Sequence, residues 1–475
     1  MNPILGRCSH YYRASLFCAT HLNLSTCSLK KSVCSYDEDC LDFLPWLSRK
    51  SGGHISPFLS IGNSSTYGRC LFASKCIYTG DSILKVPYSV QLSPDNLPPL
   101  IKSLLENEVS DNAKLAVVIL VEQKLGENSE WAPYISRLPR LGNLNSTIFW
   151  SNEDLEMIEE SSLYQETIKQ KTQIEEDFLA IKPALQHFPS LFQEVTLKEF
   201  KHAYGLVSSR AWTSTKGVSM IPFADFLNHD GISEADVLCD EAKQLSEVIA
   251  DRDYAPGDQV MIRYGKFSNR TLLLDFGFTL ATNVYDQVQI ELDIPHHDPL
   301  RTMKMDLLCR HSTPVLEDDN AFSSCGNSFV IKQVKSGSRK GRGIPQSLRA
   351  FARVICSTSS QELGDLAVEA AKIDGRLARQ PLQNHNIELQ AHQFLLSRIN
   401  QLIERYDTAV KSLAVASSLC MSNKVIPRRN LAQDLLNGEL RVLKSAGAWL
   451  KNYCDTLKQN SKRSNITSSD EEDLL

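Results

Sequence analysis

The pattern of hydrophobic and polar residues changes its period along the chain. Between residues 51 and 94, apolar residues alternate with polar ones and are separated by turns that contain glycine. This alternation is typical of short antiparallel strands, and it predicts strands at 67–73, 77–80 and 83–87. From Asp111 onwards apolar residues recur at helical spacing, so we expect an amphipathic helix there and a helical stretch that interrupts the strands.

Capping residues and prolines mark where further helices are expected to begin. Ser151 precedes a predicted helix whose apolar face is set by Leu155 and Ile158. In the last third of the chain, Pro345 begins one helix, and longer helices are predicted at about 387–413 and 427–450.

Length and composition indicate a globular protein with two or more domains. The chain has 475 residues, of which 42% are hydrophobic, which is enough for a large core. Its longest good apolar run, residues 115–121, is far shorter than the ~18 residues that span a bilayer, so no membrane segment is predicted. Residues 459–475 end in SSDEEDLL and are expected to be an acidic disordered tail.

The N-terminal segment, residues 1–36, differs from the rest of the chain in charge. It contains four basic residues and no Asp or Glu, together with many Ser, Thr and Cys residues, which is the composition of an organellar transit peptide. A disordered tail is the alternative interpretation. The formal charge of −5 includes +4 from this segment, which leaves about −9 for residues 37–475, so the composition does not suggest a nucleic-acid partner.

Three features that suggest other chemistry have simpler interpretations. Thirteen cysteines are present, but they lack the C-x-x-C spacing of zinc sites, so we expect no metal. His296 and His297 lie between two prolines and are typical of a solvated turn rather than of a metal site. The basic run at 332–343, KQVKSGSRKGRG, is interpreted as a solvated loop, with an anionic partner as the alternative.

Candidate functional residues concentrate in two stretches. Residues 221–230, IPFADFLNHD, place Asp, Asn and His within five positions after a proline-broken apolar run. Residues 261–278, MIRYGKFSNRTLLLDFGF, carry a Tyr-Gly turn. An apolar strand that ends in a polar turn presents side chains to a cleft, so both stretches predict a site. Taken alone, Asn228 to Gly231 is also compatible with an ordinary turn, and Tyr264 with a core aromatic residue at a strand end.

Together, the two stretches closely resemble the signature blocks of SET-domain protein methyltransferases. The branch concerned is typified by the plant Rubisco large-subunit lysine methyltransferase and the animal actin-histidine methyltransferase. Its first block reads roughly P-x-A-D-x-x-N-H, and its second reads Y-G-x-x-S-N with a D-Y-G-F-like end. The matching positions are Pro222, Ala224, Asp225, Asn228, His229, Tyr264, Gly265, Ser268, Asn269, Gly277 and Phe278. Ser209-Arg210-Ala211 resembles the family's S-R-A-F element, and the likeness covers nearly all of residues 40–455.

The resemblance implies an α+β fold. We expect a knot-like SET β-domain at 37–285 with a helical insert at about 98–205, followed by an all-α substrate-binding domain at 286–458. A Rossmann-type fold is not expected, because no G-x-G-x-x-G follows a predicted strand. The resemblance also implies a monomer that acts on a protein, with no nucleic acid or membrane involved.

The methyl donor implied by the resemblance is S-adenosylmethionine, and no metal is required. The implied donor-binding residues are Tyr67, Gly68, Arg69, Arg210, Asn228 and His229. The implied substrate-binding residues are Arg210, Asp225, Tyr264 and Phe276. The implied catalytic residue is Tyr264, because its hydroxyl would stand beside the methyl group and align the acceptor. On its own, Arg210 is more typical of a surface ion pair, and only the two signature blocks favour a donor-binding role.

The implied activity is transfer of methyl groups to a lysine of a plastid protein, such as Rubisco large subunit or an aldolase-like substrate. A protein-histidine methyltransferase and a non-catalytic SET-derived scaffold of a plastid assembly are the alternatives. The plastid stroma is the expected location, and mitochondrion or cytoplasm are the alternatives. Three residues depart from the family: Cys70 replaces a glycine near the donor, Phe276 replaces a tyrosine and bears on the number of methyl groups, and Ser214 replaces a basic residue.

Overall fold

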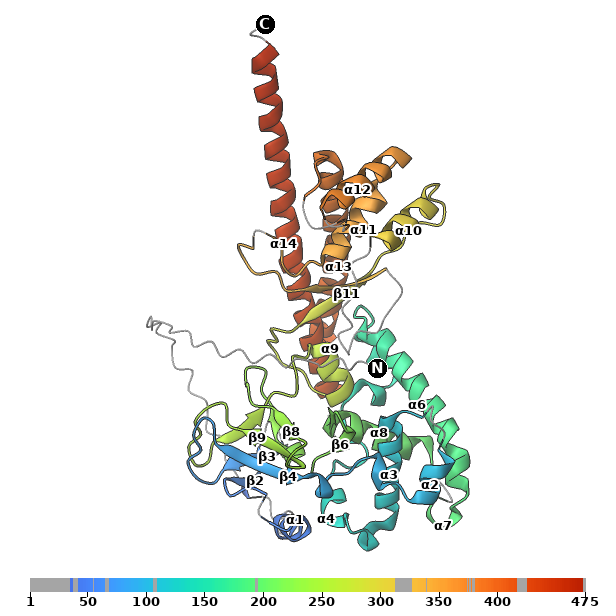
Figure 1. Ribbon diagram of the computed structural model, residues 1–475, viewed down its shortest axis with the longest axis vertical. Helices are drawn as coiled ribbons and strands as arrows, with labels where there is room; N and C mark the ends of the chain where they lie inside the picture. The colour runs from blue at the N-terminus through green and yellow to red at the C-terminus, as the bar shows by residue number, and fades with distance from the viewer. Residues whose placement is uncertain are drawn as a thin grey trace, which may run out of the picture.

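The structure is a computed structural model that describes residues 35–36, 42–53, 55–64, 68–105, 109–192, 195–311, 327–338, 340–373, 375, 377, 381–416 and 425–472. Tyr67 and residues 1–34 of the expected transit peptide lie outside these ranges. In Figure 1 the strands of the N-terminal half occupy one lower side, helices such as α3, α6 and α8 lie beside them, and the C-terminal helices stand above both.

The β-domain is built around a mixed five-stranded sheet. Its order is β1(Ser35–Tyr36), β2(Leu59–Ser64), β3(Gly68–Ala73), β10(Gln259–Ile262) and β7(Asn228–His229). A second sheet joins β4(Ser82–Pro87), β9(Leu245–Ile249) and β8(Val237–Asp240), and a hairpin joins β5(Ala211–Ser214) to β6(Gly217–Met220). The short strands β7 and β10 run parallel, with Met261 opposite Asn228 and Ile262 opposite His229, so the two signature stretches become neighbours.

Two of the three predicted early strands are confirmed, and the third is wrong. The strands expected at 67–73 and 83–87 are β3 and β4. The segment 77–80 forms only a bridge, between Ile77 and Tyr254, and then turns. The turn forms because the carboxylate of Asp81 accepts a hydrogen bond from the Tyr78 N–H at 2.8 Å, and because Gly80 adopts a φ of +92°.

The helical insert follows the expected capping signals. Its helices are α2(Pro99–Leu104), α3(Asp111–Leu125), α4(Ala132–Ile135), α5(Asn152–Glu156), α6(Leu163–Gln186), α7(Pro189–Phe192) and α8(Leu197–Arg210). Ser110 and Ser151 cap α3 and α5 through their hydroxyl groups. The prediction that α3 is amphipathic is wrong, because residues 115–121 are buried without interruption. A helix that is apolar all round belongs to a core, and here it contacts α8, α6 and β6.

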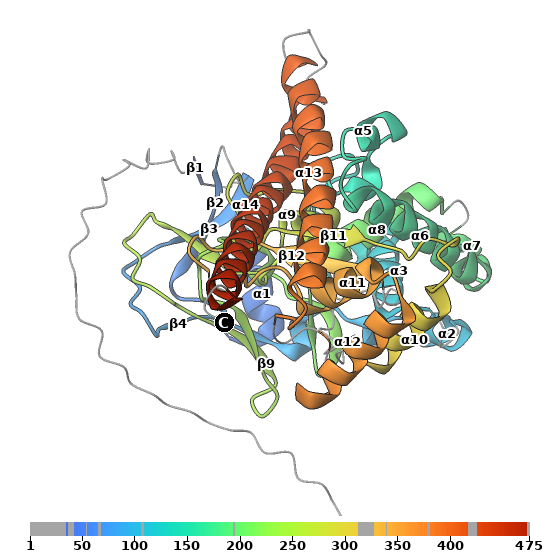
Figure 2. The ribbon, with the colours of Figure 1, turned by 90° about the horizontal axis from the view of Figure 1, so that it is seen from above.

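The C-terminal domain is helical, as expected, and opens with a two-stranded sheet that the sequence analysis does not predict. Its elements are β11(Gln287–Glu291), α10(Arg301–Arg310), β12(Ser328–Lys332), α11(Gln346–Cys356), α12(Ser360–Ile373), α13(His385–Ala416) and α14(Val425–Glu472). Figure 2 shows α13 and α14 side by side. Helix α14 continues to Glu472, where a disordered tail from 459 is expected, because adding residues to an existing helix requires no new nucleation. No helix among the described residues is long and apolar enough to cross a membrane.

A shared core joins the C-terminal domain to the insert. Trp150, Leu155, Ile158 and Leu163 of the insert pack in the same cluster as the apolar residues of α11, α13 and α14. Leu273, which belongs to the second signature stretch, is buried in this cluster as well. The two domains are therefore connected by packed apolar surface and not only by the chain between them.

A buried carboxyl group lies at this junction. Glu439 on α14 is only 2% exposed, and its oxygens accept hydrogen bonds from the Ser161 hydroxyl at 2.9 Å and the Tyr406 hydroxyl at 3.0 Å. Burial raises the pKa of Glu439 to about 7, and these two bonds only partly oppose the rise. The neighbouring charges are Arg270, which lowers the pKa, and Asp286, which raises it.

We predict that Glu439→Gln flattens the pH dependence of stability. Between a pKa near 4.5 in the unfolded chain and about 7 in the fold, the native state binds more protons, so stability falls as the pH rises through this interval. The fall is at most about 1.4 kcal/mol per pH unit for one group. Thermal unfolding from pH 5 to pH 8 should show a smaller decline for Glu439→Gln than for the unmodified chain. Glu404→Gln, at an exposed position of α13, is the control, and identical curves for both variants would contradict the prediction.

Candidate active site

A cavity of about 910 Å³ opens where the β-domain meets the helical insert. Its volume lies within the range of small-molecule sites. The lining comes from Asn63, Gly68 and Arg69 of β2 and β3, from residues 136–140 and 143–145 of the insert, and from Ser209, Arg210, Asp225, Phe226, Asn228, Tyr264, Phe276, Gly277 and Phe278. Asn63 and Phe278, which are 215 residues apart in the sequence, thus line one cavity.

Most of the candidate site residues line this cavity. They are Gly68, Arg69, Arg210, Asp225, Asn228, Tyr264 and Phe276. Tyr67 lies outside the described residues. His229 is not among the lining residues, and the expectation that its backbone and side chain contact the donor stays a prediction.

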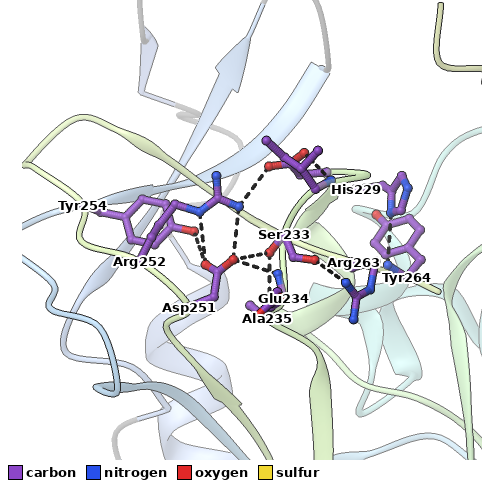
Figure 3. Close-up of polar contacts among 11 residues, drawn as sticks. His229, Ser233, Glu234, Ala235, Asp251, Arg252, Tyr254, Arg263 and Tyr264 are labelled. Carbon is purple, nitrogen blue, oxygen red and sulfur yellow. Dashed lines mark hydrogen bonds and ion pairs between the residues drawn. The ribbon is translucent and has the colours of Figure 1, made fainter. Parts of the chain in front are cut away.

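His229 holds the backbone of Tyr264 in place. It is buried beneath the site, and its Nδ1 accepts a hydrogen bond from the Tyr264 N–H at 3.0 Å (Figure 3). Burial lowers the pKa of His229, which favours the neutral ring, and the Tyr264 N–H selects the tautomer whose Nδ1 accepts this bond. The two rings lie 5.2 Å apart.

A polar network fixes the loop that follows His229. The Asp251 carboxylate accepts hydrogen bonds from the Ser233 hydroxyl at 2.9 Å and the Glu234 N–H at 2.8 Å, while Arg252 pairs with Asp230 at 3.0 Å. Arg263, next to Tyr264, donates to the Ser233 carbonyl at 2.9 Å. Figure 3 shows this network beside the His229–Tyr264 contact. The sequence analysis missed these residues, because acidic and basic residues in turns have no distinctive spacing.

Asn228 connects strand β7 to strand β3 at the edge of the cavity. Its side-chain Nδ2 donates a hydrogen bond to the Arg69 carbonyl at 3.2 Å. The neighbouring Gly68 has a φ of +70°, a conformation that side chains other than glycine rarely adopt. The open backbone at Gly68 and Arg69 therefore faces the cavity beside a polar amide.

Cys70, the departure from the family's glycine, does not line the cavity. It is fully buried in β3 and pairs with Gly62 of β2, which has no side chain. Its thiol lies 3.4 Å from the Gly68 carbonyl and 3.7 Å from the Gly62 carbonyl. The space over Gly62 thus accommodates the thiol within the sheet.

Asp225 and Arg210 form a buried polar pair in the cavity wall. Arg210 Nη1 donates to the Asp225 carbonyl at 2.9 Å and lies 3.4 Å from its carboxylate, which also accepts a hydrogen bond from the Tyr134 hydroxyl at 3.0 Å. Burial raises the pKa of Asp225, and Arg210 opposes this rise. Asp225 Oδ1 and Arg210 Nε are buried without a hydrogen-bond partner among the described residues. The role of Tyr134 was missed because its W-x-P-Y context predicts only a proline-pinned loop.

Tyr264 lines the same cavity as this polar pair and contacts two further aromatic residues, here called the aromatic wall. Its hydroxyl donates to the Leu227 carbonyl at 2.6 Å, and its ring lies 5.1 Å from Phe276 and 6.4 Å from Phe278. Burial raises the pKa of Tyr264, with a further contribution from Asp225, and Arg210 opposes the rise. The phenol therefore stays neutral at physiological pH.

The aromatic wall depends on a glycine. A π-helical turn, Leu272–Phe276, ends at Gly277, which has a φ of +77°. A Cβ atom at Gly277 would lie 2.6 Å from the Ser146 backbone nitrogen, so only glycine permits this approach. The close contact brings Phe276 and Phe278 against the 143–145 segment that completes the lining.

The described residues contain no group of three or more His, Cys, Asp or Glu residues arranged to hold a metal ion. His296 and His297 lie in an exposed turn, as expected. The lining residues offer arginine cations, a buried carboxyl group, a neutral phenol and an aromatic wall.

Two protein families match the chain. Residues 68–265 match the SET domain, and residues 295–443 match the Rubisco LSMT substrate-binding domain. Solved structures of Rubisco LSMT share the fold: one bound to AdoMet has a TM-score of 0.68 at 22% identity, covering 89% of this chain and 94% of that chain. Another, bound to sinefungin and monomethyllysine, has a TM-score of 0.69 at 23% identity with the same coverage.

The chain is also similar in sequence to several protein methyltransferases. The sequence is 23% identical to [fructose-bisphosphate aldolase]-lysine N-methyltransferase of Arabidopsis thaliana, over 79% of this chain and 76% of that protein. It is 24% identical to actin-histidine N-methyltransferase of Mus musculus, over 85% and 67%. It is 28% identical to the Rubisco large subunit N-methyltransferase of Pisum sativum, over about half of each, 51% and 52%. These matches show that the chain combines a SET domain with a Rubisco LSMT substrate-binding domain, and that it is similar over most of its length to protein methyltransferases.

Proposed function

We propose that this chain transfers methyl groups from S-adenosylmethionine to a lysine side chain of a plastid protein. The observation that carries the proposal is that Tyr264 lines one cavity together with the Arg210–Asp225 pair and the aromatic residues Phe276 and Phe278. One cavity therefore offers a polar part for a charged donor and an apolar part for an alkyl chain.

The residues of the polar part suit the donor. The cavity is large enough for it, Arg210 supplies a cation for its carboxylate, and Asn228 with the Gly68–Arg69 backbone supplies polar contacts for its adenine and amino-acid ends. The bound donor supplies an activated methyl group, so the protein's task is orientation and electrostatics. The Arg210 side chain is 23% exposed although it pairs with Asp225, so part of its guanidinium group remains accessible to the donor carboxylate.

The residues of the apolar part suit a neutral lysine. A lysine ammonium has a pKa of about 10.4 and must lose its proton before it attacks. Phe276, Phe278 and the Tyr264 ring disfavour the charged form, because they replace water by apolar surface. The neutral Tyr264 hydroxyl then orients the amine. It does not act as the base that removes the proton of the lysine.

A lysine acceptor is favoured over histidine by the apolar wall. The four methylene groups of lysine gain from burial against Phe276 and Phe278, whereas an imidazole ring loses hydrogen bonds to water there. Histidine is the alternative because actin-histidine N-methyltransferase is among the similar proteins.

The plastid location rests on two observations. Residues 1–36 have the composition of a transit peptide, and the similar proteins of Arabidopsis thaliana and Pisum sativum have names that specify the chloroplast. Rubisco large subunit and fructose-bisphosphate aldolase are accordingly the first acceptors to test. The cytoplasm and the mitochondrion are the alternative locations.

We predict that Tyr264→Phe lowers the rate of methyl transfer by about 100-fold, because the hydroxyl that orients the acceptor is lost. Donor affinity should change less than about threefold, since Arg210 and Asn228 remain. The measurement is transfer of labelled methyl from S-adenosylmethionine into a chloroplast stromal extract, with calorimetry for donor binding.

Tyr78→Phe is the matched control for this substitution. The Tyr78 side chain is exposed and lies outside the cavity lining, so the loss of its hydroxyl should leave transfer unchanged. Equal labelling by Tyr264→Phe and Tyr78→Phe would contradict the catalytic role of Tyr264. Donor binding without any labelling by the unmodified chain would favour the non-catalytic scaffold.

We predict that Phe276→Tyr shifts the product towards fewer methyl groups per lysine. The added hydroxyl would lie near the acceptor nitrogen, where it takes up room and offers a hydrogen bond worth about 1 kcal/mol, or roughly fivefold in the product ratio. Mass spectrometry of the labelled protein gives this ratio. Phe267→Tyr is the control, because Phe267 contacts Phe276 at 5.8 Å without lining the cavity, and the same shift in both variants would refute the explanation.

A further inference from the structure

We propose that α14 of the C-terminal domain positions the aromatic wall of the acceptor channel. Residues 276–286, here called the wall segment, lie between the cavity and α14. The inference rests on the proposed function and adds a role for the C-terminal domain in the methyl-transfer step itself. Asp434, Gly438 and Arg441 on α14 are the positioning residues.

The wall segment contacts the cavity through its first three residues. Phe276, Gly277 and Phe278 all belong to the lining, and the Phe276 ring lies 5.1 Å from that of Tyr264. Gly277 rests against the backbone of Asn145 and Ser146, which holds this end from the insert side. A shift of the wall segment would therefore move the surface that confines the acceptor.

The rest of the wall segment is held by one face of α14. The Thr279 hydroxyl donates to Asp434 Oδ2 at 3.0 Å. Arg441 donates to the Ala281 carbonyl at 3.2 Å and to Asp286 Oδ2 at 3.3 Å. Positions 434, 438 and 441 follow each other at steps of four and three, which places them on the same side of a helix.

Gly438 allows α14 and the wall segment to approach each other closely. A Cβ atom at this position would lie 2.1 Å from Asp286 Oδ2, so the carboxylate of Asp286 packs directly on the α14 backbone. Glycine in a helix interior costs about 1 kcal/mol relative to alanine. The close contact with Asp286 gives a physical reason for glycine here.

A buried hydrogen-bond network joins Asp286 to an earlier part of the wall segment. Asp286 Oδ1 accepts a hydrogen bond from the Asn269 N–H at 2.9 Å, and Asn269 is fully buried. The Asn269 side chain in turn accepts from the Leu280 N–H at 2.9 Å and donates to the Leu280 carbonyl at 2.8 Å. The network fixes the wall segment from within, and Arg441 clamps it from α14.

The chemical consequence is a division of roles between transfer and donor binding. Methyl transfer requires in-line geometry, and a misplacement of about 1 Å can lower the rate by about 100-fold. The donor side of the cavity is formed by Arg69, Arg210 and Asn228, which belong to β3, α8 and β7. Figure 1 shows the lower end of α14 beside α9, with strand β3 further away. Loss of the α14 contacts should therefore affect transfer and leave donor affinity nearly unchanged.

The test uses the full chain and the acceptor protein found in the labelling experiment. Thr279→Val removes one hydroxyl without changing side-chain size, and Arg441→Ala removes the clamp. We expect kcat to fall about 10-fold for Thr279→Val and up to about 100-fold for Arg441→Ala, with a changed ratio of methylation states. The Kd for S-adenosylmethionine should stay within about twofold, and Asp434→Asn, which keeps an acceptor oxygen for Thr279, should retain most of the activity.

The controls are substitutions of the same types at positions that do not contact the wall segment. Thr408→Val alters an exposed hydroxyl of α13, and Lys444→Ala removes an ion pair with Asp407 inside the C-terminal domain. If Arg441→Ala unfolds, Thr279→Val still decides the question, since one lost hydrogen bond costs only about 1 kcal/mol.

Two outcomes would overturn the inference. The first is that both variants match their controls in kcat and product ratio. The second is a raised KM with an unchanged kcat, which would mean that α14 acts only in docking the acceptor protein. A lack of transfer by the unmodified chain would instead contradict the proposed function, so the two failures are distinguishable.

Discussion

The parallel pairing of β7 with β10 brings the two signature stretches together, and the rest of the site depends on it. Each strand contributes only a few residues, so the pairing needs support from side chains. His229 Nδ1 accepts the Tyr264 N–H, Asn228 donates to the Arg69 carbonyl of β3, and the Asp251 network fixes the loop that follows. Because these groups are largely buried, their hydrogen bonds are stronger than in water and costly to leave unmade. The arrangement places a neutral phenol at a fixed point in the cavity wall.

The second organising feature is the shared core between the insert and the C-terminal domain. Leu273 of the π-helical turn is buried in this core together with residues of the long helices α13 and α14. The same turn ends at Phe276, so the core is connected to the cavity lining through it. A domain expected to serve substrate docking thus packs against the segment that shapes the acceptor channel. Docking and transfer can be coupled in this way through contiguous packing, without a separate moving part.

Much of the fold could be predicted from the sequence, and the particular failures have physical causes. The capped start of α5, the helix from Asp111 and the helix at 387–413 follow from local signals, and they are confirmed. The strand at 77–80 and the amphipathic character of α3 are wrong, because the Asp81 turn and complete burial depend on distant partners. At the site, the motifs located Tyr264, Asp225 and Arg210 correctly in one cavity. They did not reveal that His229 lies beneath Tyr264, that Tyr134 bonds Asp225, or that Cys70 fits over Gly62, since each contact joins segments that only the fold brings together.

The central claim, that the Tyr264 cavity delivers a methyl group to a lysine, is tested most directly by mapping the modified atom. The chain would be incubated with isotope-labelled S-adenosylmethionine and a stromal extract, and the labelled protein would be fragmented by mass spectrometry. Label on a lysine Nε, absent with Tyr264→Phe, is the predicted result. Label on an imidazole nitrogen, or none although the donor binds, would contradict the account.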